Sequence, residues 1–225
     1  MAVVNSIKNL ILTNYYERPF QPEIGSNVRR LLFENVDAIL SASPYYNKPS
    51  QEGLFMHYKE IATHAPKPII LYNVPGRTGR NMNAATVLKL ANEVENIIGI
   101  KEASGDMGQC MSILKDKPDT FFVVSGDDGL VLPQIACGMQ GVISVAANAF
   151  PVEFGKMVQL CLANEFAAAK KINDSLLKAY DLMFEENNPY SYSCLKTKLH
   201  LAGSFSLILF WIITKFTSPK VLITF

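Results

Sequence analysis

A lysine at the end of an apolar run is the first candidate for chemistry in this sequence. Lys101 follows residues 96–100, which read NIIGI. If this run is a strand, alternation puts Ile97, Gly99 and Lys101 on one face, and Gly99 leaves room beside the lysine. A lysine emerging from such a strand into a protein interior loses solvation, which lowers its pKa and frees the amine as a nucleophile. A Schiff base with a carbonyl compound needs such an amine, although pairing with Glu102 would be an ordinary structural role.

Two further side chains could act beside such a lysine. Tyr72 lies in the run PIILYN (68–73), and its phenol could carry the protons that carbinolamine dehydration and enamine formation require. A core tyrosine with a hydrogen-bonded hydroxyl is the alternative. Arg77 follows in a Pro-Gly turn and could hold a substrate carboxylate with two hydrogen bonds, or it could be an ordinary solvated loop arginine.

A pair of adjacent tyrosines forms a third candidate. Tyr45 and Tyr46 lie in the segment PYYNKP (44–49), whose two prolines stiffen the backbone and fix the direction of the rings. Surface loops seldom carry two adjacent tyrosines that pack on nothing. We therefore expect this segment to belong either to an interface or to a site.

Short apolar runs alternate with helical patterns along the chain and must position these side chains. Each run is at most eight residues long and rich in Ile and Val, which is typical of strands buried on both faces. The runs are residues 36–40, 68–73, 96–103, 121–128 and 141–148. The helical patterns are residues 51–64, 83–93, 107–117 and 129–137, followed by a long helical region at 152–185. Ser50 and Asn83 are suited to cap their helices, and Gly138 to end one.

Strands that alternate with helices predict a parallel sheet, which is either doubly wound or a barrel. Polar clusters end nearly every strand, at residues 41–47, 72–78, 101–106, 125–128 and 144–148. In a barrel the carboxyl ends of all strands line one site, whereas a doubly wound sheet concentrates such residues at one switch point. No GxGxxG or GxxxxGK[ST] pattern follows any run. We therefore predict an α/β fold of the (β/α)₈ TIM-barrel type.

Composition excludes several classes of protein. The chain has 225 residues, of which 49% are hydrophobic and 18% charged, with a net charge of +1. These proportions are globular, and the small net charge gives no reason to expect a nucleic acid or a membrane as partner. The four cysteines and three histidines form no ligand pattern, which disfavours a metal and a disulfide framework and suits a reducing cytoplasm.

The two ends of the chain differ from the rest. Residues 187–225 contain four lysines and no acidic residue, whereas residues 36–186 hold 13 basic and 17 acidic residues. The N-terminus has no basic region ahead of its apolar run, so we expect no signal peptide. Residues 201–214 are apolar but shorter than the ~20 residues that span a membrane, so we expect a buried helix or strand there rather than a membrane anchor, or else a non-native tail.

Five motifs in order carry a resemblance to a known family. They are PYYNKPSQEG (44–53), LYNVPGRTG (71–79), GIKEASGD (99–106), SGDD (125–128) and GVISVAAN (141–148). Together they resemble the dihydrodipicolinate synthase family, a branch of the pyruvate-dependent class I aldolases that form a Schiff base on a (β/α)₈ barrel. The arginine of the second motif and the residues after the lysine of the third resemble the synthase more than N-acetylneuraminate lyase.

The resemblance implies a lyase reaction in lysine (diaminopimelate) biosynthesis. Lys101 would attack the ketone of pyruvate, and the enamine formed after proton loss would add to L-aspartate-4-semialdehyde, giving 4-hydroxy-tetrahydrodipicolinate. Tyr72 would donate and accept protons, and Tyr46 resembles the relay residue that reaches into the site of a neighbouring subunit. No cofactor is implied, because the protonated imine is itself the electron sink.

The resemblance also implies binding residues and partners. Arg77 would bind the carboxylate of the aldehyde, Ile143 would contact pyruvate through its backbone, and Gly126 and Asp127 would shape the aldehyde pocket. Tyr45 resembles the aromatic residue at the pocket for the inhibitor L-lysine in feedback-regulated members. A homotetramer built as a dimer of dimers is implied as well.

The sequence departs from the family in its first and last parts. The family's Gly-Thr-Thr-Gly-Glu motif, whose threonines bind pyruvate and complete the relay, is absent. Residues 24–27 could be a remnant of the third strand unit with a helix at 28–34, and residues 1–23 match nothing. Eight units typically take about 250 residues. We expect an incomplete barrel without its first units at residues 1–150, with 1–35 hard to place, a C-terminal helical region at 151–186 and a divergent tail at 187–225.

These departures leave alternative functions open. The chain could be a working lyase in which other residues supply the missing parts. It could instead be a non-catalytic fragment of the synthase that keeps the site residues without a complete site. If active, it could also be another pyruvate-dependent aldolase, such as N-acetylneuraminate lyase.

Overall fold

One parallel sheet organises the fold, and its strands follow the order of the chain. The computed structural model of the protein describes residues 10–13, 37–185 and 222–224. The strands are β1 (Leu10–Thr13), β2 (Ala38–Ala42), β3 (Ile69–Asn73), β4 (Ile97–Glu102), β5 (Phe122–Ser125), β6 (Val142–Ser144) and β7 (Leu222–Thr224). Each strand pairs in parallel with the next. Because the order never reverses among the described strands, the sheet has the succession of a barrel rather than a doubly wound sheet, and the prediction of a (β/α)₈-type fold is confirmed.

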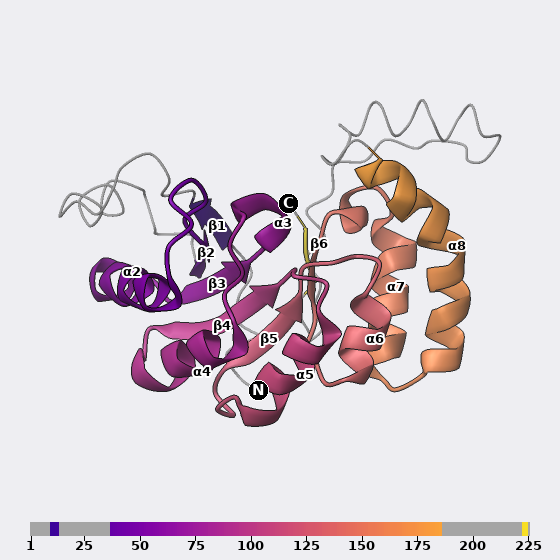
Figure 1. Cartoon of the computed structure of the whole chain (residues 1–225). Coiled ribbons are helices and arrows are strands. Elements are labelled where there is room, and N and C mark those ends of the chain that lie inside the picture. Colours follow the sequence, from indigo (N-terminus) through magenta and orange to yellow (C-terminus); the bar gives the residue numbers. More distant parts are fainter. Residues whose placement is uncertain (1–9, 14–36, 186–221, 225) are drawn as a thin grey trace.

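Helices cover one side of this curved sheet, with α2, α4 and α5 beside one half and α6, α7 and α8 beside the other (Figure 1). They are α2 (Gln51–His64), α3 (Pro75–Thr78), α4 (Ala84–Glu93), α5 (Met107–Asp116), α6 (Val131–Ala136), the short 3-10 helix η1 (Ala146–Asn148), α7 (Pro151–Leu162) and α8 (Phe166–Phe184). Both predicted caps are confirmed, since Ser50 accepts a hydrogen bond from the Gly53 amide at 3.1 Å and Asn83 from the Thr86 amide at 2.8 Å.

The structure differs from the sequence prediction at three kinds of element. The long helical region is broken into α7 and α8 at Asn164, whose φ of 64° is a left-handed conformation that asparagine tolerates. The predicted Pro-Gly turn holds the short helix α3, which begins at Pro75, ends at Thr78 and is capped by Gly79 with φ of 68°. Strands β1 and β7 were not predicted, because runs of four and three residues are too short to show periodicity.

Several sequence predictions lie outside the described residues. These are the remnant strand at 24–27, the helix at 28–34 and the apolar segment at 201–214. Among the helices of the described residues, none is both long enough and apolar enough to cross a membrane.

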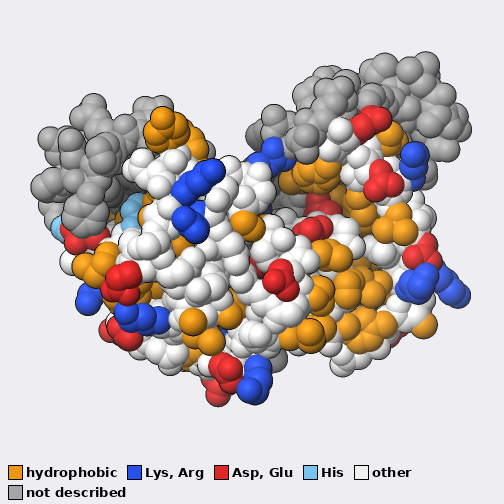
Figure 2. All heavy atoms as spheres, in the orientation of Figure 1, with side chains coloured by type: hydrophobic (Ala, Val, Ile, Leu, Met, Phe, Trp, Pro, Cys, Tyr) orange, Lys and Arg blue, Asp and Glu red, His pale blue; other side chains and the backbone are white. Residues whose placement is uncertain are grey.

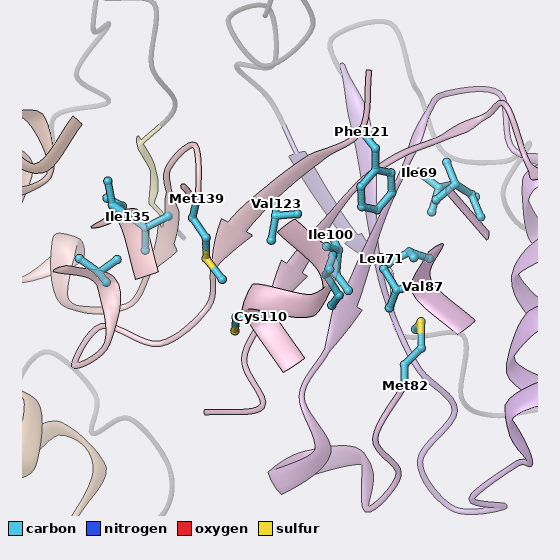
Figure 3. Close-up of a cluster of buried hydrophobic side chains, with 14 of the residues drawn as sticks. Ile69, Leu71, Met82, Val87, Ile100, Cys110, Phe121, Val123, Ile135 and Met139 are labelled. Carbon is cyan, nitrogen blue, oxygen red and sulfur yellow. The ribbon is translucent and has the colours of Figure 1, made fainter. Parts of the chain in front are cut away.

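The larger hydrophobic core lies between the sheet and the helices. Figure 3 shows Leu71, Ile100 and Val123 on the strands in one cluster with Val87 of α4 and Cys110 of α5. All five side chains are fully buried. Burial of an aliphatic side chain stabilises the folded state by about 1.5–3 kcal/mol, so this layer fixes α4 and α5 on the sheet.

A smaller cluster lies on the opposite face of the sheet, inside its curvature. Its buried members are Ala38, Leu40, Ile70, Phe122, Val124 and Ile143. Tyr72 and Ile98 pack against it. Because successive residues of a strand face opposite sides, Ile70 and Tyr72 point inward while Leu71 between them points to the helices.

A β-bulge in β4 decides which way the lysine points. Ile97 pairs with Ile69 but Gly99 pairs with the next residue of β3, so Ile98 is an extra residue. Ile97 packs in the helix-facing cluster and Ile98 against the inner cluster. The prediction that Ile97 shares a face with Gly99 and Lys101 was therefore wrong, because regular alternation does not continue through the bulge.

Replacing Gly99 by alanine should lower the free energy of unfolding by about 1–3 kcal/mol, the usual cost of overpacking a core. A Cβ at Gly99 would lie 2.5 Å from the ring of Phe122, which is buried in the inner cluster. Chemical denaturation of the variant measures the loss. Gly76→Ala is the matched control, because a Cβ there has no neighbour within 4 Å. Equal stability of the two variants would contradict the close packing at Gly99.

Candidate active site

Lys101 and Tyr72 lie side by side on the inner face of the sheet. They are register partners on β4 and β3, and the Lys101 Nζ atom lies 4.3 Å from the centroid of the Tyr72 ring. The lysine is only 5% exposed. Burial lowers its pKa to about 8, and the negative charge of Asp128 acts in the opposite direction. The predicted environment of a desolvated lysine beside a phenol is present.

Gly126 gives the lysine its space. A Cβ at this position would lie 2.9 Å from Cε of Lys101 and 2.7 Å from Cβ of Ala103. The Gly126 amide donates a hydrogen bond to the Glu102 carbonyl at 2.8 Å, which holds the end of β5 against the end of β4. A side chain here would therefore displace the stem of Lys101.

The pKa of the half-buried Tyr72 is raised, mainly because burial disfavours the charged form of its phenol. The positive charge of Arg77 lowers this pKa and the negative charge of Asp128 raises it. Arg77 is exposed and belongs to α3, directly after β3. Burial keeps the phenol protonated, and the nearby arginine eases the loss of its proton, so Tyr72 is suited to proton transfer.

Glu102 follows Lys101 but serves the opposite face of the sheet. Its carboxylate accepts hydrogen bonds from Asn73 Nδ2 at 3.0 Å, from the Ser104 amide at 2.7 Å and from Gln109 Nε2 at 3.0 Å. The side chain is fully buried, at 0% exposed. These bonds occupy Glu102 in a network between the strand ends and α5, so the simple Lys101–Glu102 pairing considered from the sequence does not describe it.

Asp128 is a site residue that the sequence analysis did not single out. It is 5% exposed and follows β5, and its Oδ2 accepts hydrogen bonds from the amides of Val145 at 3.2 Å and Ala146 at 2.8 Å. The two adjacent acids of SGDD were visible at a strand end. The sequence could not show which of them turns inward.

The arrangement combines a nucleophilic amine, a proton carrier and a buried carboxylate at the carboxyl ends of neighbouring strands. An amine with a pKa of about 8 is neutral often enough near physiological pH to attack a ketone or aldehyde. In the part of the chain that the structure describes, no three His, Cys, Asp or Glu side chains come together as metal ligands would. The geometry therefore suits Schiff-base chemistry on a carbonyl compound.

Comparison with known proteins agrees with this chemistry. Residues 33–207 match the Dihydrodipicolinate synthetase family. The chain is 48% identical over 193 residues to the 4-hydroxy-tetrahydrodipicolinate synthase of Parabacteroides distasonis, covering 82% of this chain and 65% of the relative. This chain belongs to the dihydrodipicolinate synthetase family.

Solved structures of family members have the same fold. A dihydrodipicolinate synthase from Cyanidioschyzon merolae with lysine bound is 36% identical, with a TM-score of 0.71 over 80% of this chain and 60% of the other. The enzyme from Acinetobacter baumannii complexed with pyruvate is 39% identical, with a TM-score of 0.68 over 75% of this chain and 57% of the other. The chain thus spans about two thirds or less of the length of these family members.

The adjacent tyrosines of the family motif PYYNKP lie on an exposed loop after β2. Tyr45 is 44% exposed and Tyr46 is 87% exposed. The segment after α3 fixes this loop. The Arg80 guanidinium donates a hydrogen bond to the Lys48 carbonyl at 3.0 Å, and the stem of Lys48 packs against Gly79. Both tyrosine side chains are therefore exposed on a loop that these contacts fix.

Of the remaining residues expected from the family motifs, one lies in the inner cluster and another in the turn after β5. Ile143 is buried in the inner cluster, against which Tyr72 packs. Asp127 is part-buried, and its Oδ1 accepts a hydrogen bond from the Gly129 amide at 3.1 Å. Ser125 Oγ contacts both the amide and the carbonyl of Asp127, so the turn after β5 is tightly fixed.

Proposed function

We propose that this chain acts as a lyase that condenses pyruvate with L-aspartate-4-semialdehyde to give 4-hydroxy-tetrahydrodipicolinate, in lysine biosynthesis. The observation that carries the proposal is the buried Lys101 amine, with a pKa lowered to about 8, lying against the Tyr72 ring. Relatives named 4-hydroxy-tetrahydrodipicolinate synthase, 48% identical, support the choice of substrates.

The reaction begins with the neutral Lys101 amine attacking the ketone carbon of pyruvate. The carbinolamine loses water with proton transfer through Tyr72, which leaves a protonated imine on the lysine nitrogen. Loss of a methyl proton gives the enamine, whose carbon attacks the aldehyde. Cyclisation through the amine of the aldehyde substrate displaces Lys101 and regenerates the free enzyme.

The other residues named from the family motifs complete the proposal. Arg77 binds the carboxylate of the aldehyde, and its position directly after β3 and its effect on Tyr72 support this role. Ile143 presents its backbone to pyruvate, and Gly126 and Asp127 shape the aldehyde pocket. The reaction requires no cofactor, and we place it in the cytoplasm.

The proposed partner is a second copy of the chain, in a homotetramer built from dimers. Tyr46, at 87% exposed, is suited to reach a neighbouring subunit, and Tyr45 to line a pocket for L-lysine. The lysine bound to the enzyme of Cyanidioschyzon merolae supports such regulation. Hydrophobic side chains gather over α6 and α7 on the face shown in Figure 2, and Val152 of α7 is 74% exposed, which favours an interaction surface.

Trapping with pyruvate and borohydride tests the lyase function. Intact-mass spectrometry should show one reduced pyruvyl group per chain. The initial rate of trapping should rise with pH through about 8, since only the neutral amine attacks. About one tenth of such an amine is neutral at pH 7, against less than one in a thousand for an ordinary lysine. No adduct on folded protein would overturn the proposal in favour of a non-catalytic family member.

A panel of aldehydes then distinguishes the substrates. Preferred consumption of L-aspartate-4-semialdehyde with pyruvate supports the synthase. Cleavage of N-acetylneuraminate, or preference for another aldehyde, would assign the chain to another pyruvate-dependent aldolase. Arg77 is the residue with the most influence on this choice, because a guanidinium binds a carboxylate with two hydrogen bonds.

A further inference from the structure

The carboxylate of Asp128 is buried and fixed in place just after β5, the strand that pairs with the Lys101 strand β4. Its Oδ2 accepts hydrogen bonds from two successive backbone amides, those of Val145 at 3.2 Å and Ala146 at 2.8 Å. Burial raises the pKa of this carboxyl, whereas the two backbone hydrogen bonds and the positive charge of Lys101 lower it. Its Oδ1 is inaccessible to solvent and has no hydrogen-bond partner among the described residues.

A buried carboxylate oxygen without a hydrogen bond is costly, so it calls for a compensating charge. Lys101 supplies one, because the two side chains act on each other electrostatically. The β4–β5 pairing and the bare Gly126 bring the lysine stem against the turn that carries Asp128. One carboxylate oxygen thus accepts hydrogen bonds from the backbone, and the other is buried without one.

We propose that Asp128 is a positioning residue that stabilises the positive charge on the Lys101 nitrogen when the protonated imine forms. This role rests on the proposed Schiff-base function. The imine is formed from the neutral amine, the ketone and one proton with loss of water, and it carries a full positive charge in a buried site. Asp128 forms no covalent bond and supplies the matching negative charge. Its two backbone hydrogen bonds keep it at the end of β6.

Removing the charge of Asp128 would also affect the other charged and titratable groups around it. Lys101 of β4 and Tyr72 of β3 both feel its charge, as does the buried Tyr180 of α8. Arg77 acts on Tyr72, and Cys161 of α7 acts on Tyr180. Of these groups, only the amine of Lys101 becomes a cation through its own reaction with pyruvate.

The sign of the effect follows from the loss of one negative charge. In Asp128→Asn the pKa of Lys101 falls further below about 8, because the negative charge of Asp128, which opposes the effect of burial, is gone. The acid limb of the trapping rate should move to lower pH by about one unit. The imine itself loses stabilisation, so the pyruvate concentration for half-maximal trapping should rise about tenfold.

Three variants of Asp128 separate charge from structure. Asp128→Asn removes the charge but keeps an oxygen to accept from the two amides, whereas Asp128→Ala removes both. Asp128→Glu keeps the charge while displacing the hydrogen bonds, so its acid limb should stay near that of the wild type even if its stability falls. Asp106→Asn is the control, because Asp106 also accepts from a backbone amide, that of Gln109 at 3.0 Å, but is exposed.

The experiment measures the pH dependence of borohydride trapping and the thermal midpoint of each variant. A shift of the acid limb shared by the Asn and Ala variants, with a thermal loss mainly in Ala, supports the proposal. An unshifted limb in Asp128→Asn, with normal trapping by the wild type, overturns it and leaves the lyase function standing. Absence of any adduct on the wild type overturns the lyase function itself, and the role of Asp128 with it.

Discussion

The variant Lys101→Ala is expected to form no pyruvate adduct and to lose at least about four orders of magnitude in turnover, since no other group replaces a covalent nucleophile. Borohydride trapping with intact-mass spectrometry measures the first effect and a coupled condensation assay the second. Lys117→Ala is the matched control. Lys117 also has a pKa lowered by burial, but its Nζ donates to the Phe121 carbonyl at 2.7 Å, away from the sheet interior. A persistent adduct in Lys101→Ala would show that another amine reacts.

The same variant has a stability signature with a definite sign. The pKa of Lys101 is about 8 in the folded chain and about 10.4 when unfolded, so the unfolded chain binds more protons between these values. The free energy of unfolding of the wild type should therefore rise by about 3 kcal/mol as pH increases through this window. Urea denaturation of Lys101→Ala should show a flatter profile there. Parallel profiles would mean that Lys101 is not desolvated.

Replacing Glu102 by alanine should cost about 3–5 kcal/mol of folding free energy. The substitution removes the charged acceptor of three donors, those of Asn73, Ser104 and Gln109, and a hydrogen bond to a charged group contributes about 1.5–3 kcal/mol. The total stays near the lower end of the sum, because Asn73 and Gln109 also donate to the Asn81 side chain. Glu102→Gln keeps one acceptor oxygen but turns an amide donor toward other donors, so its loss should be intermediate. Urea denaturation gives both values.

The control for this loss is an exposed acid nearby in the chain. Glu95→Ala, in the turn between α4 and β4, should change the unfolding free energy by less than about 0.5 kcal/mol. The network also stabilises the strand ends that carry the site, because Asn73 and Glu102 are register partners directly after the pair Tyr72 and Lys101. In Glu102→Ala the yield of the trapped pyruvate adduct should therefore fall at least as much as the fraction of folded protein. A variant as stable as the control would refute this stabilising role.

The elements of the fold that were predictable have local causes. Helix α2 begins and ends where the sequence indicated because Ser50 caps its start and a proline follows its end. The order of strands and helices followed from apolar runs of suitable length. The barrel type followed from polar residues at nearly every strand end, which a barrel brings together at one site.

The features that escaped prediction depend on the fold as a whole. The break between α7 and α8 needs Asn164 in a conformation that the sequence permits but does not demand. The choice of Asp128 over Asp127 as the inward carboxylate depends on where the β6 backbone lies. Lys101 and Tyr72 were expected near each other, and they are register partners on neighbouring strands. The β-bulge that turns the lysine inward was not predicted.

The β-bulge at Ile98 has a consequence for transplanting this site. A regular strand that kept Ile97 toward the helices would turn Lys101 toward the helices and Glu102 toward the interior, exchanging nucleophile and carboxylate. A protein engineer who grafts the motif GIKEASGD onto an unbulged strand, with the residue two before its glycine facing the helices as Ile97 does here, should obtain an inert lysine in the helix-facing layer. The graft needs either the extra residue or a lysine moved by one position, so the transferable unit is the motif together with the irregularity that precedes it.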